Sequence, residues 1–158
     1  MKLISTTIAT SVWLLLAACG GPDVEATIPQ AEPAEASSID IGDYIVHFSA
    51  QLTDQLPPEV ARLYNIVRSK NRVMLNVSVI EETSGNGVPA DVSVKTVNLT
   101  GQLKTVNMRK LEEQEAIYYV GETPIANRET LVFDITVGVE GIEEPAKMRF
   151  KRQFFTDH

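Results

Sequence analysis

The sequence predicts an all-β domain, an antiparallel immunoglobulin-like β-sandwich of about seven strands with one short helix. Apolar and polar residues alternate along several segments after residue 43, as they do in strands that bury one face. Turn residues such as Ser84-Gly85-Asn86-Gly87 separate these segments. An up-and-down β-barrel is the alternative fold.

Seven segments make up the predicted strands. The alternation is clearest in 44–52, where Val46, Phe48 and Ala50 share one side, and it recurs in 73–79 and 131–139. The weaker candidates are 92–99, 103–111, 116–121 and 147–155. In 92–99 the apolar parity changes, which predicts a β-bulge near Lys95 and Thr96.

One strand and one helix have a less regular pattern. Residues 117–120 are apolar or aromatic on both faces, so 116–121 is either a central strand covered on both sides or a strand with an exposed tyrosine. Between the first two strands, Pro57-Pro58 precedes apolar residues at helical spacing. A short helix is expected there, and its apolar face would consist of Val60, Leu63, Tyr64 and Val67.

The N-terminus has the pattern of a secretory signal peptide, with Lys2 ahead of an apolar segment and small residues. Leu16-Ala17-Ala18-Cys19 also resembles the lipobox of bacterial lipoproteins, and Cys19 is the chain's only cysteine. In that class the thiol of the cysteine carries a diacylglycerol and the new amine is acylated, which anchors the protein firmly. Gly20, where that class can have Asp, favours the periplasmic side of the outer membrane.

Three parts of the chain follow from these patterns: a signal peptide (1–18), a lipidated N-terminus with a flexible linker (19–42), and the β-sandwich domain (43–158). The linker prediction depends on prolines, small residues and acids without any Lys or Arg between residues 20 and 42. The formal net charge is -7. A chain this acidic lacks the cations that neutralise phosphates, so nucleic acid is not expected as a partner.

The domain resembles a family of Gram-negative envelope proteins defined by a domain of unknown function, DUF4426. The resemblance lies in "GDYIVHFSA" (42–50), "YNIVRSKNRVMLNVSV" (64–79), "LTGQLK" (99–104), "EEQEAIYYVGETPIANRETLVFDITV" (112–137) and "FKRQFF" (150–155). It implies a secreted or lipid-anchored β-rich envelope domain, and it provides no catalytic residues.

Candidates for chemistry are few. His47 and Ser49 share one face of the first strand and Asp134 lies in another, but no nucleophile elbow accompanies them. The other histidine, His158, is the last residue, so a transition-metal site is not expected. We therefore expect no enzyme activity and no cofactor, while an envelope hydrolase that uses His47 is an alternative.

Two basic groups are the candidate partner contacts: Arg68, Lys70 and Arg72 beside the helix, and the alternating Lys147, Arg149 and Lys151. Lipid phosphate, a wall polymer or an acidic envelope protein would fit them, although pairing with acids on neighbouring strands explains them as well. The expected function is that of a lipid-anchored binding or accessory module. A carrier that holds an apolar ligand between its sheets is a further alternative.

Overall fold

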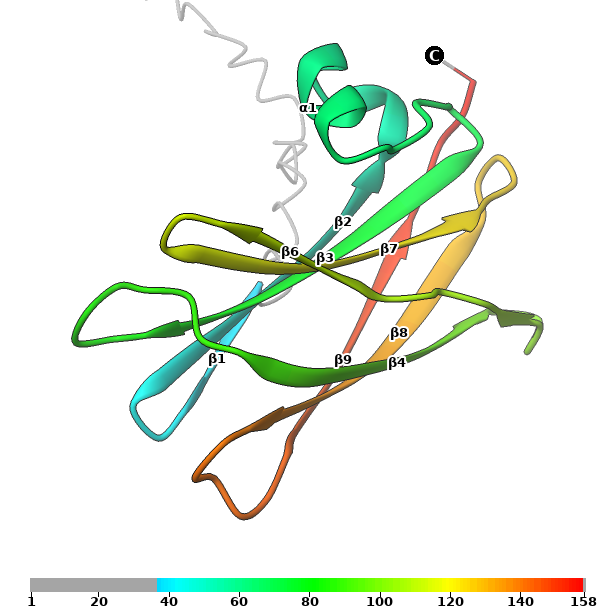
Figure 1. Ribbon diagram of the computed structural model, residues 1–158. Coiled ribbons are helices and arrows are strands. Elements are labelled where there is room, and N and C mark those ends of the chain that lie inside the picture. The colour runs from blue at the N-terminus through cyan, green and yellow to red at the C-terminus, as the bar shows by residue number, and fades with distance from the viewer. Residues whose placement is uncertain (1–36, 158) are drawn as a thin grey trace, which may run out of the picture. The chain divides into compact units, whose positions relative to one another are not determined.

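The computed structural model describes residues 37–157, which form a two-layer antiparallel β-sandwich (Figure 1). The elements of this part of the chain are β1 (Ser38–Ile41), β2 (Tyr44–Leu52), a 3-10 turn η1 (Thr53–Gln55), α1 (Pro58–Leu63), β3 (Arg72–Glu81), β4 (Ala90–Asn98), β5 (Leu103–Lys104), β6 (Arg109–Glu113), β7 (Ala116–Pro124), β8 (Thr130–Val139) and β9 (Ala146–Gln153). The all-β prediction with one short helix is confirmed.

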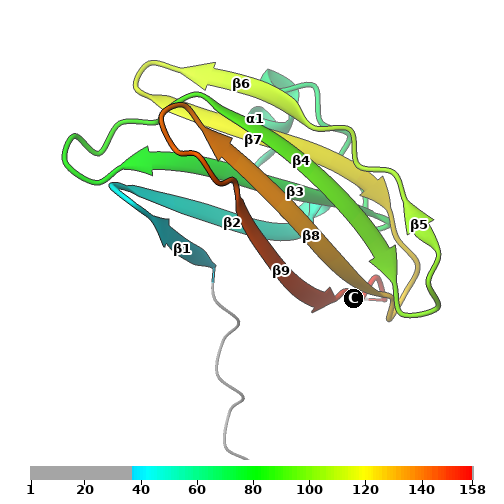
Figure 2. The ribbon, with the colours of Figure 1, turned by 90° about the horizontal axis from the view of Figure 1, so that it is seen from below.

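The strand order is that of an immunoglobulin-like sandwich. The first sheet has the order β1-β2-β3-β7-β6 and the second sheet has the order β5-β4-β8-β9. Without β1 and β5, the strands pair as first-second-fifth-fourth and third-sixth-seventh in chain order, which is the constant-type immunoglobulin arrangement. Figure 2 shows β4, β8 and β9 layered over the first sheet. The two sheets are separate, so the barrel alternative is wrong.

The two additional strands come from segments that the sequence analysis assigned differently. β1 lies within 19–42, so the linker prediction is wrong for Ser38–Ile41, where Ile39 and Ile41 pack against the core. β1 pairs with β2 in antiparallel register, from Ser38 opposite His47 to Ile41 opposite Tyr44. The folded domain therefore includes residues that precede 43.

The predicted strand 103–111 is two strands in different sheets. β5 pairs with β4, β6 pairs with β7, and the residues between them cross from one sheet to the other. This crossing passes close to β7, because a Cβ atom at Gly121 would lie 2.6 Å from both Val106 Cγ1 and Met108 Sδ. Only glycine leaves room for that passage.

The main core lies between the two sheets. Phe150 of β9 packs on Phe133 of β8 with ring centroids 4.8 Å apart and on Phe48 of β2 at 5.1 Å, so the three rings connect both layers. β4 pairs with β8 in continuous register from Ala90 to Asn98, so the predicted bulge is wrong. The parity changes because Thr96 is buried in place of an apolar residue.

The helix forms where the prolines predicted it, and Val60, Leu63 and Tyr64 of its predicted apolar face lie on the side of the sheet, but the prediction is wrong for Val67. α1 ends at Leu63, and Asn65 has a left-handed backbone conformation (φ 53°), so Tyr64 and Val67 do not continue the helix. The buried residues are Leu56, Ala61 and Ile66, whereas Leu63 is 66% exposed and Val67 is 64% exposed.

Candidate functional site

The basic residues predicted on 147–151 lie together on the outer face of the second sheet, which is the face directed away from the core. Lys147, Arg149 and Lys151 are exposed, while Met148 and Phe150 between them face the core. The Arg149 guanidinium donates two hydrogen bonds to the Asp134 carboxylate. These bonds, with the charges of Arg149 and Lys95, hold the pKa of Asp134 below its ordinary value of 3.8. Part of this basic group is therefore paired with an acid on the neighbouring strand.

The second predicted basic group lies on the other side of the sandwich. Arg72 begins β3 on the outer face of the first sheet and pairs with Glu122 of β7 at 3.7 Å. The guanidinium of Arg68 donates to the carbonyl oxygen of Asp54, and Lys70 lies in the same segment. The structure therefore does not bring the two basic groups together in one surface.

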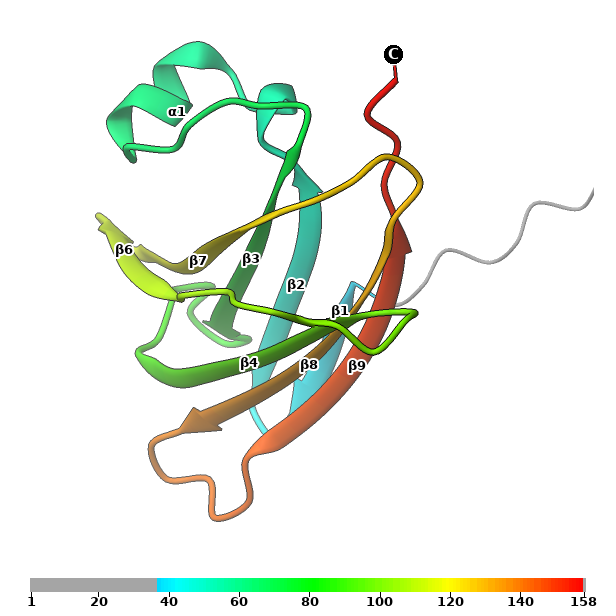
Figure 3. The same cartoon turned by 90° about the vertical axis from the view of Figure 1, so that its right-hand side faces the viewer.

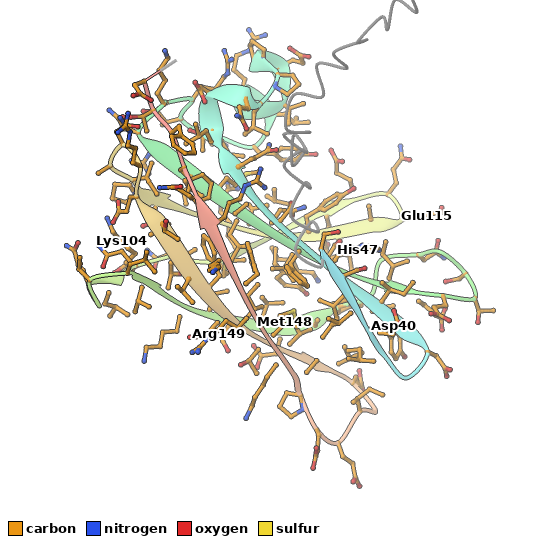
Figure 4. All side chains as sticks on the ribbon, turned by 180° about the vertical axis from the view of Figure 1, so that it is seen from behind. Asp40, His47, Lys104, Glu115, Met148 and Arg149 are labelled. Carbon is orange, nitrogen blue, oxygen red and sulfur yellow. The ribbon has the colours of Figure 1, made fainter. Side chains whose placement is uncertain are left out.

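The residues considered for hydrolysis do not meet. His47 and Ser49 are exposed on the outer face of the first sheet, because Val46 and Phe48 of the same strand face the core. Asp134 is on the outer face of the second sheet. Figure 4 shows His47 on β2 and Arg149, the partner of Asp134, on β9. A Ser-His-Asp site from these three residues is therefore not formed.

Other sequence-based candidates fall outside residues 37–157 or have no counterpart among them. Cys19, the predicted signal peptide, most of the predicted linker and His158 are not among the described residues. Within the described part, no three His, Cys, Asp or Glu side chains gather as metal ligands do. The helices of the same part are too short or too polar to cross a bilayer.

A mostly apolar concave site lies between α1 and the outer face of the first sheet. The segment that carries α1 leaves the sheet after β2 and returns at β3, and Thr53 closes it at its base. The buried Thr53 hydroxyl donates to the carbonyl oxygen of Val67 at 2.8 Å and accepts the backbone N–H of Ser69 at 2.9 Å. In addition, Arg109 of β6 donates from its guanidinium to the carbonyl oxygen of Tyr64. These bonds fix α1 over the sheet, on the side of β6 and β7 (Figure 3).

A second, smaller apolar cluster holds α1 in place. Leu56, Ala61 and Ile66 from the α1 segment pack on Met74 of β3 and Val120 of β7. These contacts fill only part of the space. A groove of about 370 Å³ stays open beside them. Its lining is mostly apolar and comes from the α1 segment (Leu56, Val60, Leu63, Tyr64, Ile66) and from the sheet (Met74, Asn76, Leu111, Glu113, Tyr118, Val120).

The two neighbouring tyrosines of β7 point to opposite faces of the first sheet. Tyr119 is in the main core, where its hydroxyl accepts the backbone N–H of Ala90 at 2.7 Å. Tyr118 points to the opposite side and lines the groove. β7 is thus a central strand with apolar groups on both faces, which was one of the two interpretations of 116–121.

The groove was missed in the sequence analysis. Its signals were the apolar residues on both faces of 116–121 and Met74, which is out of parity with the core residues of 73–79. An outer sheet face that carries apolar residues needs a cover, and the exposed Leu63 on α1 shows that the cover is incomplete.

These features place the domain among the immunoglobulin-like β-sandwiches, with an apolar groove added to the outer face of one sheet. The chain belongs to the family described as Domain of unknown function (DUF4426), which matches residues 38–157. A solved structure of a DUF4426 family protein from Pseudomonas aeruginosa PAO1 is similar to it at 35% sequence identity, with a TM-score of 0.65. That alignment covers 77% of this chain and 95% of the Pseudomonas chain. No curated protein matches the chain.

Proposed function

We propose that this protein is a lipid-anchored binding module of the bacterial envelope and that it binds its ligand in the groove beside α1. The anchor would be Cys19, at the end of the Leu16-Ala17-Ala18-Cys19 motif, on the periplasmic side of the outer membrane. The domain that follows would act through binding. No cofactor is part of this proposal.

The observation that carries the proposal is the open apolar groove. Binding sites for small molecules are concave, mostly apolar and about 300–1,000 Å³ in volume, with a few polar groups that orient the ligand. The groove beside α1 has a volume of about 370 Å³, and the polar residues Asn76 and Glu113 and the amphipathic Tyr118 accompany its apolar lining. Unlike the carrier considered from sequence, the site lies outside the sandwich and not between its sheets.

The test of the groove uses two matched substitutions in the α1 segment. Leu63 and Val67 are exposed to nearly the same extent, but only Leu63 lines the groove. We expect a neutral apolar fluorescent dye, N-phenylnaphthylamine, to bind the purified full chain, L63E to weaken this binding and V67E to leave it unchanged. Equal binding by both variants, or no binding by the unmodified chain, would contradict the proposal.

The anchor is tested separately. The mass of the protein isolated from its native host should correspond to a chain that begins at Cys19 and carries acyl groups, and C19S should abolish membrane attachment. An unmodified Cys19 thiol or a retained signal peptide would exclude the lipid anchor. Neither result would bear on the proposal that the groove binds a ligand.

The exposed basic residues of β9 form a second surface, which is not part of the groove. Lys147, Arg149 and Lys151 are proposed contacts for an anionic envelope partner, and exchange of these three for Glu should weaken such binding without unfolding the domain, since all three are exposed. Neither Lys147, Arg149 and Lys151 nor His47 lines the groove.

A further inference from the structure

β9 forms an open edge of the second sheet. It is the last strand in the order β5-β4-β8-β9, and β8 is its one neighbour in the described part of the chain (Figure 2). The other edge strands are shorter, with four residues in β1, two in β5 and five in β6, whereas β9 has eight. Its register with β8 is continuous from Ala146 to Gln153. Short strands, bulges and prolines commonly protect a sheet edge, and β9 has none of these protections.

The backbone groups that face this open edge belong to the basic residues of β9. At the end of the strand, the Phe154 N–H donates to the carbonyl oxygen of Glu129 at 3.0 Å, in the register that joins β8 and β9. In an antiparallel strand, every second residue directs its N–H and C=O groups to the same side. The odd-numbered residues of β9, which include Lys147, Arg149 and Lys151, therefore direct these groups away from β8. A strand added at the edge would meet them.

The charges of β9 determine what can pair with it. Two copies of β9 would bring basic side chains opposite one another, and like charges in opposing positions destabilise a pair of strands. A strand with acids at alternate positions would instead place a carboxylate opposite each of Lys147, Arg149 and Lys151. The guanidinium of Arg149 would be shared between that carboxylate and Asp134. The edge therefore favours an acidic strand over a second copy of itself.

A pocket of about 280 Å³ lies at the end of this edge. Its lining comes from the ends of β2 and β9 and from residues that follow these strands: Gln51, Leu52, Gln55, Arg152, Gln153, Phe154 and Phe155. Leu52 and Phe154 are buried, whereas Phe155 is 51% exposed. Arg152 has the parity of the core-facing residues of β9, so an added residue opposite Arg152 would direct its side chain toward the pocket.

We infer that β9 binds an extended acidic segment of an envelope protein as an additional antiparallel strand, with one apolar side chain of that segment in the pocket beside Phe155. The inference rests on the part of the proposed function that assigns Lys147, Arg149 and Lys151 to an anionic partner, and it does not involve the groove beside α1. Main-chain hydrogen bonds along the edge supply affinity in this mode of binding, while the charges and the pocket supply selectivity.

The experiment adds the peptide acetyl-Leu-Glu-Val-Glu-Val-Glu-amide to the full chain with C19S, which cannot be lipidated. Aligned antiparallel to β9, this peptide places its acids opposite the three basic residues and its Leu opposite Arg152. Amide hydrogen exchange is followed residue by residue by NMR. We expect the amides of Arg149 and Lys151 to exchange readily in the free chain and to be protected by the peptide. The Phe150 amide is directed at β8, so it should be protected in both states and is the internal control.

Modified peptides separate strand addition from attraction between charges. In the antiparallel alignment, the N–H groups of the Glu residues point at β9 and those of the Val residues point away from it. N-methylation of the Glu residues should therefore weaken binding by at least about tenfold. N-methylation of the Val residues is the matched control and should leave binding unchanged. A peptide with Lys in place of Glu should bind about tenfold more weakly, because it brings like charges together.

The pocket is tested with F155A and with a peptide in which Ala replaces the Leu. F155A should weaken binding of the Leu peptide by about threefold and leave binding of the Ala peptide unchanged, because only the Leu side chain reaches the pocket. The control is L103A, since Leu103 is another exposed apolar residue and does not line the pocket. L103A should change the binding of neither peptide.

The outcomes separate this inference from the proposed function. If both methylated peptides bind as tightly as each other, the basic side chains attract acids without strand addition, so the inference is wrong and the proposed anionic contact stands. If the Lys and Glu peptides bind equally, both are wrong. Protection of the Arg149 and Lys151 amides before any peptide is added would show that this chain or a second copy occupies the edge, which would also overturn the inference. Equal effects of F155A and L103A would exclude the pocket from it. None of these results bears on dye binding in the groove.

Discussion

The outer face of the second sheet carries charged and polar side chains open to solvent, whereas the outer face of the first sheet carries an apolar strip that α1 covers in part. On the second sheet, Arg149 and Asp134 pair across neighbouring strands and Lys147 projects beside them. On the first sheet, Met74 and Val120 are buried beneath the α1 segment. Both sheets bury their inner faces in the same core.

This difference indicates that the segment between β2 and β3 is an addition to the sandwich, which buries its main core without it. An antiparallel sandwich is complete when its inner faces are buried, and its outer faces can be polar. The second sheet meets that condition without further structure. The first sheet has an additional segment between β2 and β3, with its own apolar cluster and its own closing hydrogen bonds at Thr53. The main core does not require this segment, and it is the part of the domain to which the proposed function assigns binding.

Loss of a buried side chain from the outer face of the first sheet should have the largest effect on the free energy of unfolding. M74A removes a 7% exposed side chain from the cluster under α1 and should lower the free energy of unfolding by about 2–3 kcal/mol. The matched change on the other face, V132A, removes a half-buried side chain with no cover and should cost less than about 1 kcal/mol. Urea denaturation measures both. Equal losses would mean that the two outer faces do not differ in burial.

The hydrogen bonds that close the α1 segment should have the next largest effect. T53V keeps the shape of the side chain but leaves the Val67 carbonyl and the Ser69 N–H without their partner, so a loss of about 1–3 kcal/mol is expected. Hydrogen exchange at Ala61 and Ile66 should accelerate at the same time. The control is T136V on the outer face of the second sheet, which should change stability by less than about 0.5 kcal/mol. Unchanged exchange in T53V would contradict the role of Thr53 as the closure.

The sandwich could be predicted because the alternation of inward and outward residues is a local property. β2, β3 and β8 were recognised from the sequence for this reason. The alternation does not state which sheet a strand joins, so 103–111 was predicted as one strand although its two ends pair in different sheets. Thr96 produced a false bulge because a buried threonine looks polar in a period-two pattern.

The groove could not be predicted because its geometry depends on where one short helix ends. Proline at the start and helical spacing correctly indicated α1, but the spacing was extended through Tyr64 and Val67. The left-handed conformation of Asn65 reverses the chain and turns Ile66 inward instead. That outcome depends on tertiary contacts with Met74 and Val120, which lie on two other strands. In contrast, Lys147, Arg149 and Lys151 lie on the outward side of β9, as the alternation predicted.

The smallest effect on stability is expected from the pH dependence of two carboxylates. Glu129 is largely enclosed, whereas Asp134 lies on the open outer face of the second sheet. Burial raises the pKa of Glu129, but hydrogen bonds from the backbone of Ala126 and from Lys104 and Asn98 outweigh burial, so its pKa lies below its ordinary value of 4.5. Its carboxylate lies 2.9 Å from Lys104 Nζ. The pKa of Asp134 is also lowered, by the hydrogen bonds from the exposed Arg149.

For a lowered pKa, the stabilisation is present above the ordinary value and is lost as the pH falls through the folded-state value. E129Q should therefore be less stable than the unmodified chain near neutral pH, by about 1 kcal/mol, and the difference should shrink as the pH falls below about 4.5. D134N should show the same direction with a smaller difference, and high salt should remove it because the pair is exposed. Urea denaturation at a series of pH values and two salt concentrations measures both variants. A salt-resistant effect in D134N that equals that of E129Q would mean that the open face contributes to stability as strongly as the enclosed pair does.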